Sequence, residues 1–370
     1  MPPKTTLWKM DAHTKGKHLV LRNYLNAWLP IMASRDGTIL FIDGFAGPGK
    51  YEGGEDGSPV IAMKAVRDHH AKDRFRAKVA FLFVDNDKDR TAHLEQHIAT
   101  LEKEIKERTH SVDIITGSFD ATVGGIAQSL TAAGKSLAPA FVMVDPFGVS
   151  DTPMVVISDI LRHPMSEVYI SVMWEHIDRF HKTKEFPPHL DALFGTTEWR
   201  TPLALSDWSD RKRGLFALYK KQLKACATDV PIHVVHFELY EGGNLVYAIF
   251  HATKSNVGCD RMKAAIWKVA PFDGMAFRPG EEGLVSLFEK DTTQLEGQLR
   301  ATFGDAAWHD VDELERWIMT DATVYHKSHL RTALKAIEDG KHLEHRPEAG
   351  KKRRGKTFPC GSEVKIAAVA

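Results

Sequence analysis

The sequence has few cysteines, no long apolar run and no apolar leader. Its three cysteines, Cys226, Cys259 and Cys360, are scattered, so they neither form a disulfide framework nor pair at metal-ligand spacing. The longest apolar runs, such as Ala140–Val144, are far shorter than a membrane-spanning helix requires. The residues up to His18 are polar and lack the apolar core of a signal peptide. We therefore expect a cytoplasmic protein that does not associate with membranes.

The sequence also lacks an excess of either charge, because 49 Lys and Arg residues balance 49 Asp and Glu residues. Overall charge thus gives no sign of a nucleic-acid partner, which has to be argued from local distribution. That distribution is uneven, since Gly350–Lys356 contains five cations in seven residues. The 19 histidines show neither an HExxH pattern nor Cys/His ligand spacing, so no metal site is predicted.

Short apolar segments alternate with helical patterns in the first half of the chain. Each apolar segment is too uniformly apolar to have a solvent-exposed face, which indicates a parallel sheet covered on both sides by helices. The predicted strands are 38–42, 79–84, 112–116, 140–144 and 168–173, and the predicted helices are 14–33, 58–69, 89–108, 121–133 and 154–162.

Two further strand-like segments, 232–240 and 245–251, are joined by Glu241-Gly242-Gly243-Asn244, which is a hairpin signal. A parallel sheet that ends in an antiparallel hairpin is the arrangement of Rossmann-like class I methyltransferases. The predicted fold class is therefore α/β with this sheet, and another doubly wound enzyme with an edge hairpin is the alternative.

The C-terminal part follows another pattern. A Gly- and Pro-rich stretch at 272–282 suggests a linker. Three predicted helices (292–303, 311–319 and 327–339) and two short strands (343–346 and near 364–369) then give the outline of a winged helix-turn-helix. We divide the chain into an N-terminal helical segment (1–36), a methyltransferase domain (37–275), a linker (276–291) and a winged helix-turn-helix domain (292–370).

The most informative segment is Phe41–Gly49, FIDGFAGPG. A strand that ends at an acid and turns through glycines lets backbone amides approach a ligand closely at a helix N-terminus. The carboxylate would repel a phosphate but suits a cation, such as the sulfonium and α-ammonium of S-adenosylmethionine. The string also resembles the first motif of DNA and RNA methyltransferases, although nucleotide-binding and purely structural turns use glycines too. The predicted cofactor contacts here are Asp43, Gly44, Phe45, Gly47 and Gly49.

The ends of the next two strands extend the predicted cofactor pocket. Asp85, followed by Asn86, stands where a Rossmann-like fold places a carboxylate against ribose hydroxyls, although its spacing from the glycine loop is longer than usual. Ser118, Phe119 and Asp120 end the third strand and could hold the adenine ring and its amino group. A solvated strand-end acid and an ordinary turn are the respective alternatives.

The fourth strand ends in Asp145-Pro146-Phe147-Gly148, at the edge where such folds bind ligands. An exocyclic base amine is a poor nucleophile because its lone pair is conjugated with the ring. The Asp145 carboxylate and the Pro146 carbonyl, accepting its two hydrogens, would pull the nitrogen towards sp³ and aim its lone pair at the methyl group. Phe147 could stack on a base taken out of its helix. We predict these three as catalytic, against the alternative of an Asp-Pro turn with a core phenylalanine.

Four segments together resemble the three-Cys-motif partner (TcmP) family over nearly the whole chain: HTKGKHLVLRNYLNAWLP, FIDGFAGPGKY with its trailing GSP, VDPFG, and HATKSNVGCDRMKAAIWK. The resemblance implies a methyltransferase-like protein with a C-terminal winged helix, and a radical-SAM-like three-Cys-motif protein as a candidate partner. DPFG departs from the D-P-P-Y/F of adenine-N6 methyltransferases. It is more similar to the D-P-F-G of tRNA guanine-N2 dimethyltransferases, which favours RNA slightly.

The C-terminal segment carries cations where a winged helix meets nucleic acid. Polar residues start the predicted recognition helix, and the basic stretch falls at the wing tip, where cations could reach phosphates. The predicted contacts are Lys327, Ser328, Arg331, Lys351, Lys352, Arg353, Arg354 and Lys356. A cationic run can also be a solvated loop, and winged helices also dock proteins.

The leading hypothesis is a methyltransferase that uses S-adenosylmethionine to modify an exocyclic amine of an RNA or DNA base. A second hypothesis is a non-catalytic adaptor that uses a degenerate methyltransferase fold to bind nucleic acid or a protein. A third is a small-molecule or protein methyltransferase whose winged helix dimerises the chain.

Overall fold

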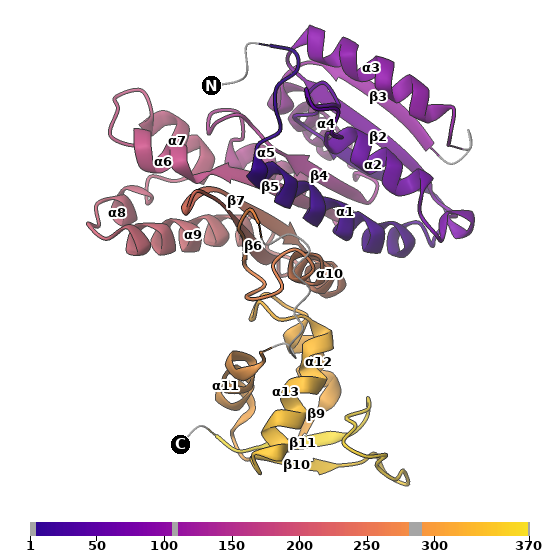
Figure 1. Cartoon of the computed structure of the whole chain (residues 1–370), viewed down its shortest axis with the longest axis vertical. Coiled ribbons are helices and arrows are strands. Elements are labelled where there is room, and N and C mark those ends of the chain that lie inside the picture. Colours follow the sequence, from indigo (N-terminus) through magenta and orange to yellow (C-terminus); the bar gives the residue numbers. More distant parts are fainter. Residues whose placement is uncertain (1–4, 106–109, 281–290, 369–370) are drawn as a thin grey trace.

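The computed structural model describes residues 5–105, 110–280 and 291–368, and its centre is an eight-stranded sheet (Figure 1). The strand order is β3-β2-β1-β4-β5-β7-β6-β8, and β7 runs antiparallel to both β5 and β6 while the remaining pairs are parallel. The strands are β1 (Thr38–Asp43), β2 (Lys78–Asp85), β3 (His110–Thr116), β4 (Ala140–Val144), β5 (Ser166–Met173), β6 (His233–Glu241), β7 (Asn244–Thr253) and β8 (Ala276–Phe277). The predicted fold class is confirmed.

Helices cover both faces of this sheet because successive side chains of each buried strand point to opposite faces. Phe41 and Phe141 belong to the core on one face, and Ile42 and Val142 to the core on the other. The first face is covered by α1 (Ala12–Met32), α2 (Ser58–Arg67), α3 (Lys88–Glu102) and α10 (Asn256–Trp267). The second is covered by the π-helical turn η3 (Asp120–Gly124) and by α4 (Gly125–Ala132), α5 (Met154–Leu161), α7 (Pro187–Phe194) and α9 (Trp208–Lys224).

Several elements were not predicted from the sequence. They are the short 3-10 helix η1 (Lys72–Arg74), the helices α6 (Trp174–Phe180), α7, α8 (Arg200–Leu203), α9 and α10, and the two-residue strands β8 and β9 (His309–Asp310). The helix predicted at 89–108 ends at Glu102, and residues 106–109 lie outside the described part of the chain. Among the described helices, none combines the length and the apolarity that crossing a membrane requires.

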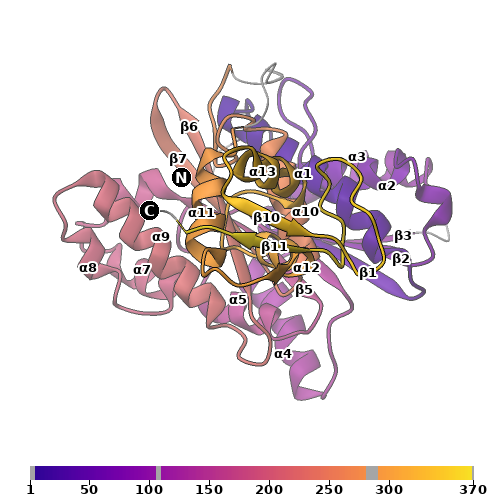
Figure 2. The ribbon, with the colours of Figure 1, turned by 90° about the horizontal axis from the view of Figure 1, so that it is seen from below.

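The C-terminal elements have a hydrophobic core of their own, which includes Leu299, Leu314 and Leu334. In chain order they are α11 (Thr293–Phe303), β9, α12 (Val311–Ile318), α13 (Lys327–Asp339), β10 (Leu343–Arg346) and β11 (Glu363–Ile366), and the strands form an antiparallel sheet β10-β11-β9. Figure 1 shows these orange and yellow elements standing apart from the large sheet, on the side of α10, and Figure 2 shows them from below, in front of the large sheet. The last strand ends at Ile366, before the predicted Val369, which lies outside the described residues.

The predicted linker at 276–291 begins too early. Ala276 and Phe277 form β8 and pair with β6, so the large sheet continues past residue 275. Phe277 is fully buried, and its ring packs so closely on Gly16 of α1 that a Cβ there would lie 2.5 Å from it. An aromatic side chain with this much contact belongs to the core. Residues 281–290 of the predicted linker lie outside the described residues.

Buried polar contacts join the C-terminal elements to α10. The Lys263 ammonium of α10 donates to the carbonyl oxygens of Ile318, Thr320 and Thr323, at 2.5, 2.6 and 3.3 Å. These carbonyls end α12 and begin the following loop, where the helix dipole favours a cation. The backbone amide of Lys327 donates to the Asp260 carboxylate of α10 at 2.7 Å.

We expect Lys263→Met to destabilise the C-terminal unit by at least about 2 kcal/mol, because three buried carbonyl groups lose their donor. Denaturant unfolding followed at tryptophan checks this, and Lys268→Met, at the exposed C-cap of the same helix, is the matched control. Equal midpoints for the two variants would show that Lys263 does not hold the two parts together.

Candidate active site

Two cavities lie side by side at the carboxyl ends of the central strands. The loop cavity, about 60 Å³, is lined by the glycine loop Phe45–Lys50 together with Trp8, Lys17 and Asp145. The strand-end cavity, about 210 Å³, is lined by seven of the predicted cofactor residues, namely Gly44, Phe45, Asp85, Asn86, Ser118, Phe119 and Asp120. Phe45 and Phe147 line both cavities. The structure thus brings the predicted motifs together at this edge of the sheet, although Asp43 itself lines neither cavity.

The glycine loop needs its glycines for conformation and for space. Gly47 and Gly49 have φ angles of 61° and 78°, in the left-handed region that favours glycine. A Cβ on Gly44 would lie 2.3 Å from the Phe119 ring, so only hydrogen fits between the ends of β1 and β3. The amide of Gly47 donates to the Asp85 carboxylate at 2.9 Å, which fixes the loop to the end of β2.

Asp43 ends β1 as a fully buried carboxyl. Its Oδ1 accepts a hydrogen bond from the Phe45 amide at 3.1 Å, whereas Oδ2 has no hydrogen-bond partner among the described residues. Burial raises the pKa of Asp43 to about 7, against the lowering effects of the Ser58 hydroxyl and the Phe45 amide. A cationic group placed against Oδ2 would stabilise the ionised form of this carboxyl.

Asp85 and Asp120 differ in what they offer a ligand. Both oxygens of the buried Asp85 carboxylate already accept backbone amides, from Gly47 and from Asp87, each at 2.9 Å. Because each carboxylate oxygen has two lone pairs, it can still accept further hydrogen bonds. Asp120 is exposed at the start of η3, and the Ser118 hydroxyl holds the pKa of its carboxyl below the ordinary range. Phe119 is buried, with its ring centroid 5.6 Å from that of Phe45.

Asp145 follows β4 and lines the loop cavity, where the Lys17 ammonium of α1 forms an ion pair with it. Although burial raises the pKa of Asp145, the Lys17 charge holds it below the ordinary value, so this carboxylate stays ionised. The neighbouring His18 has its pKa lowered to about 3, first by burial and then by Lys17. Pro146 is buried and lines neither cavity with its side chain. Lys17 was missed because its partner is 128 residues away in the sequence.

The segment before α1 also contributes to the site. Trp8 meets the Phe147 ring edge-on with centroids 5.3 Å apart, and the Arg90 guanidinium lies 5.1 Å from the Trp8 centroid and 5.4 Å from that of Phe147. The Trp8 carbonyl accepts the Glu52 amide at 2.9 Å, which holds this segment across the glycine loop. Phe147 is therefore partly covered by the chain itself. A polar N-terminus with one tryptophan gave no sign of this.

A scan of the sequence against protein-family models found no match, and a search of curated proteins found none either. Solved structures that are similar include an rRNA methylase from Streptococcus thermophilus, with 9% identity over 63% of this chain and 92% of that chain at a TM-score of 0.32. Protein LPL1258 from Legionella pneumophila has 7% identity over 64% of this chain and 84% of that chain at 0.37. An O-methyltransferase from Bacillus cereus in complex with SAH has 10% identity over 63% and 80%, at 0.34. The resemblance to the TcmP family stays a prediction.

Two of the three predicted nucleic-acid residues of α13, Lys327 and Ser328, have partners within the protein. The Lys327 backbone amide binds Asp260 of α10, and the Lys327 ammonium pairs with Glu315 at 2.7 Å. Ser328 contacts the His326 ring at 3.2 Å, and Arg331 is exposed. The start of α13 therefore lies against α10, which is not the open position of a helix that enters a groove of DNA.

The basic stretch between β10 and β11 is only partly available. Arg353 pairs with Glu338, Lys356 with Asp339, and Lys351 with Glu348. For Lys352 and Arg354, both exposed, no ion-pair partner occurs within the described ranges. This surface therefore has two cations, Lys352 and Arg354, that could bind phosphates directly. The other three could do so only by leaving the acids with which they now pair.

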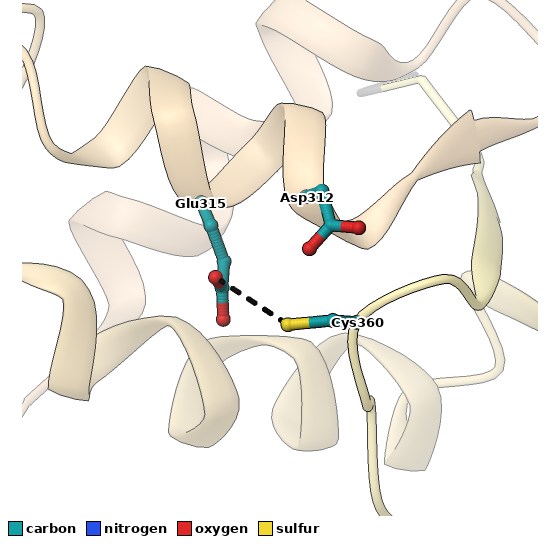
Figure 3. A group of neighbouring side chains, drawn as sticks. All are labelled: Asp312, Glu315 and Cys360. Carbon is teal, nitrogen blue, oxygen red and sulfur yellow. Dashed lines mark hydrogen bonds between the residues drawn. The ribbon is translucent and has the colours of Figure 1, made fainter.

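One group of side chains in the described residues places three ligand atoms within 4.8 Å of one another: Asp312, Glu315 and Cys360 (Figure 3). The Cys360 thiol points at Glu315, at 3.9 Å, and Glu315 also pairs with Lys327. Asp312 accepts the Gly361 amide at 3.0 Å. These contacts join α12, α13 and the loop before β11.

Proposed function

We propose that the chain is an S-adenosylmethionine-dependent methyltransferase. The observation that carries the proposal is Asp43, a fully buried carboxyl with one oxygen unmatched, at the end of β1 and beside a glycine loop. A carboxyl in this position is costly unless a cationic ligand binds it. The sheet order, with the antiparallel β7 between β5 and β6, places it at the edge where doubly wound folds bind ligands.

The residues present fit this cofactor in charge. Asp43 matches its cationic amino-acid end, and the glycine loop presents backbone amides with no Cβ in the way. The strand-end cavity offers the Asp85 carboxylate for ribose hydroxyls, with Phe119 and Asp120 for the adenine ring and its amino group. When bound, the cofactor supplies a methyl group on a sulfonium, which is a strong electrophile.

Within this proposal, Asp145 and the Pro146 carbonyl hold the accepting amine. Lys17 keeps Asp145 ionised, so the carboxylate acts only as a hydrogen-bond acceptor. Accepting the hydrogens of an amine would draw its nitrogen towards sp³ and raise its nucleophilicity. Phe147 would then contact the flat face of the acceptor, after moving away from Trp8.

The acceptor that we propose is an exocyclic amine of an RNA or DNA base. Phe147 beside Asp145 supports an acceptor whose amine is attached to a flat ring. The exposed Lys352 and Arg354 support an acceptor that is part of a polyanion. We further propose that residues 292–370 are a winged helix domain, because α11, β9, α12, α13, β10 and β11 follow one another in that order. The radical-SAM-like three-Cys-motif protein stays a proposed partner on the resemblance alone.

A non-catalytic adaptor is the second candidate function, and one observation favours it. Lys17 occupies an oxygen of Asp145, and Trp8 covers Phe147, so both predicted catalytic side chains already have partners.

Transfer of a labelled methyl group from S-adenosylmethionine to DNA, tRNA and rRNA pools separates the two functions. Incorporation by the wild type alone, and not by an Asp145 variant, supports the enzyme, whereas cofactor binding without incorporation into any pool supports the adaptor.

We expect the wing to contribute a salt-dependent part of nucleic-acid affinity. Changing Lys351, Lys352, Arg353, Arg354 and Lys356 to serine should remove about three to five phosphate contacts, each contributing about −0.9 to the log–log salt slope on a duplex or about −0.7 on a single strand. The nucleic acid should be long, because Figure 1 shows the wing at the end of the long axis farthest from the sheet. Fluorescence anisotropy at several salt concentrations measures the slope.

The double variant Lys352→Ser/Arg354→Ser sharpens this test, because it removes only the cations without an ion-pair partner in the described structure. It should account for about two contacts and leave cofactor affinity unchanged. An unaltered slope in the fivefold variant would identify the wing as a solvated loop and favour protein docking by this domain.

A further inference from the structure

A third cavity, unrelated to the glycine loop, opens at the amino end of β5, on the opposite edge of the sheet. Its volume is about 170 Å³, and it lies between the last turns of α1, the start of β5 and the start of α10. Apolar side chains, among them Trp28 and Met32 of α1 and Met165 before β5, form most of its wall. We call this space the amino-edge pocket.

The mouth of the amino-edge pocket is ringed by apolar side chains that remain in contact with water. Ile31, Met165 and Val257 have 43%, 48% and 39% of their surface exposed, although each comes from a different element. Apolar surface left in water costs about 25 cal/mol for each Å² that a ligand could cover. Clusters of this kind, around a cavity, mark binding sites more often than isolated apolar residues do.

The floor of the amino-edge pocket is a buried acid. Glu167 is only 6% exposed, and its Oε2 accepts the Tyr24 hydroxyl at 2.8 Å and contacts His251 Nε2 at 3.1 Å. Its second oxygen, Oε1, accepts no hydrogen bond from the described residues. Unlike Asp43 Oδ2, this oxygen is not among the buried atoms that lack a partner, so it is open to the space of the pocket, where a donor or a cation can reach it.

The neighbouring cations do not neutralise Glu167. The Lys254 ammonium is directed at the carbonyl oxygens of Leu161 and His163, and the Arg261 guanidinium lies 4.0 Å from Asp260. His251 Nδ1 is buried without a hydrogen-bond partner in the described chain, and only Nε2 of this ring contacts Glu167. Within the described residues, no Lys or Arg pairs with Glu167.

We propose that the amino-edge pocket binds a small organic cation, a ring-sized apolar group that carries a protonated amine on a short stem. The ammonium would donate to Glu167 Oε1, and the apolar group would lie against Trp28, Met32 and Met165. The volume suits this class of ligand, because an apolar cavity of about 150 Å³ accommodates benzene. The site is separate from the proposed methyl-transfer site and does not rest on the proposed function.

Binding of 2-phenylethylamine to the full chain, compared with its neutral analogue 2-phenylethanol, tests the proposal. Calorimetry or ligand-observed NMR on the wild type should show saturable binding of the amine at one site, at least tenfold tighter than binding of the alcohol. Glu167→Gln should remove this preference while the alcohol still binds. Asp113→Asn, which changes an exposed acid on β3 away from the amino-edge pocket, should leave both affinities unchanged.

Met165→Trp provides a second variant, since this exposed residue at the mouth can be enlarged without disturbing the core. The added ring should block entry and lower the affinity for both probes at least tenfold. Absence of amine binding to the wild type, or an amine preference that survives in Glu167→Gln, would overturn the proposal.

Discussion

Replacing Asp145 by asparagine should lower the rate of methyl transfer by about 10²- to 10³-fold, which is the effect of removing one polar group that stabilises a transition state. Asparagine keeps the shape of the side chain and an oxygen that can contact Lys17. It lacks the negative charge of the Asp145 carboxylate, which Lys17 keeps ionised in the wild type. Cofactor affinity should stay within a few-fold, because the predicted cofactor contacts lie at the ends of β1, β2 and β3 and in the loops that follow these strands.

A single-turnover assay with labelled cofactor gives the rate, and calorimetry gives the affinity. A fall in kcat with unchanged binding identifies a group that acts in the chemical step. Asp113→Asn is the control, an exposed acid on β3 away from both cavities. Loss of cofactor binding in Asp145→Asn, with normal turnover at saturating cofactor, would mean that the end of β4 belongs to the cofactor pocket.

Asp43→Asn should weaken binding of S-adenosylmethionine by about 10- to 150-fold, which corresponds to the roughly 1.5–3 kcal/mol of a lost charge-assisted hydrogen bond. The wild type should also bind more weakly as pH falls. Since the pKa of Asp43 is raised to about 7 by burial, the carboxyl is protonated below that pH and loses its attraction for a cation. The asparagine variant should show no such dependence between pH 6 and pH 8.

The same substitution has an opposite effect on the free chain. A carboxyl whose folded pKa lies above its unfolded value stabilises the fold at low pH and loses that contribution as pH rises through about 7. Asp43→Asn should therefore raise the unfolding midpoint at pH 8 while it weakens cofactor binding. A variant that is less stable, or that binds the cofactor like the wild type at every pH, would show that Asp43 is a core group with no ligand.

Local pattern was enough to predict strands β1 to β7 of the large sheet, but neither the short β8 nor the residues that each element contacts in space. Ala140–Val144 was predicted with its observed bounds, because five apolar residues between turn signals define a buried strand. The glycine loop was readable because left-handed glycines and a strand-end acid are local features. The helices between Trp174 and Lys224 were not predicted, since long-range packing against the sheet decides their faces.

The site residues that the sequence did not reveal all act through distant contacts. Lys17 gains its role from Asp145, Trp8 from Phe147, and Arg90 from both rings and from Asp85. The start of α13 looked like an open recognition surface because nothing in KSHLR shows that Asp260 binds its first amide. The alternation of apolar segments and the residues of the turns predict which strand ends meet at one edge of the sheet. Ion pairs between distant elements depend on the completed fold.

The central claim is that this fold binds S-adenosylmethionine at the end of β1, and calorimetric titration of the full chain with S-adenosylhomocysteine tests it most directly. The demethylated product keeps the α-ammonium, the ribose and the adenine, so its binding needs no acceptor and no partner protein. We expect one site per chain at pH 8, weakened in Asp43→Asn and unchanged in Asp113→Asn. A wild-type chain that binds neither the product nor S-adenosylmethionine would contradict the account.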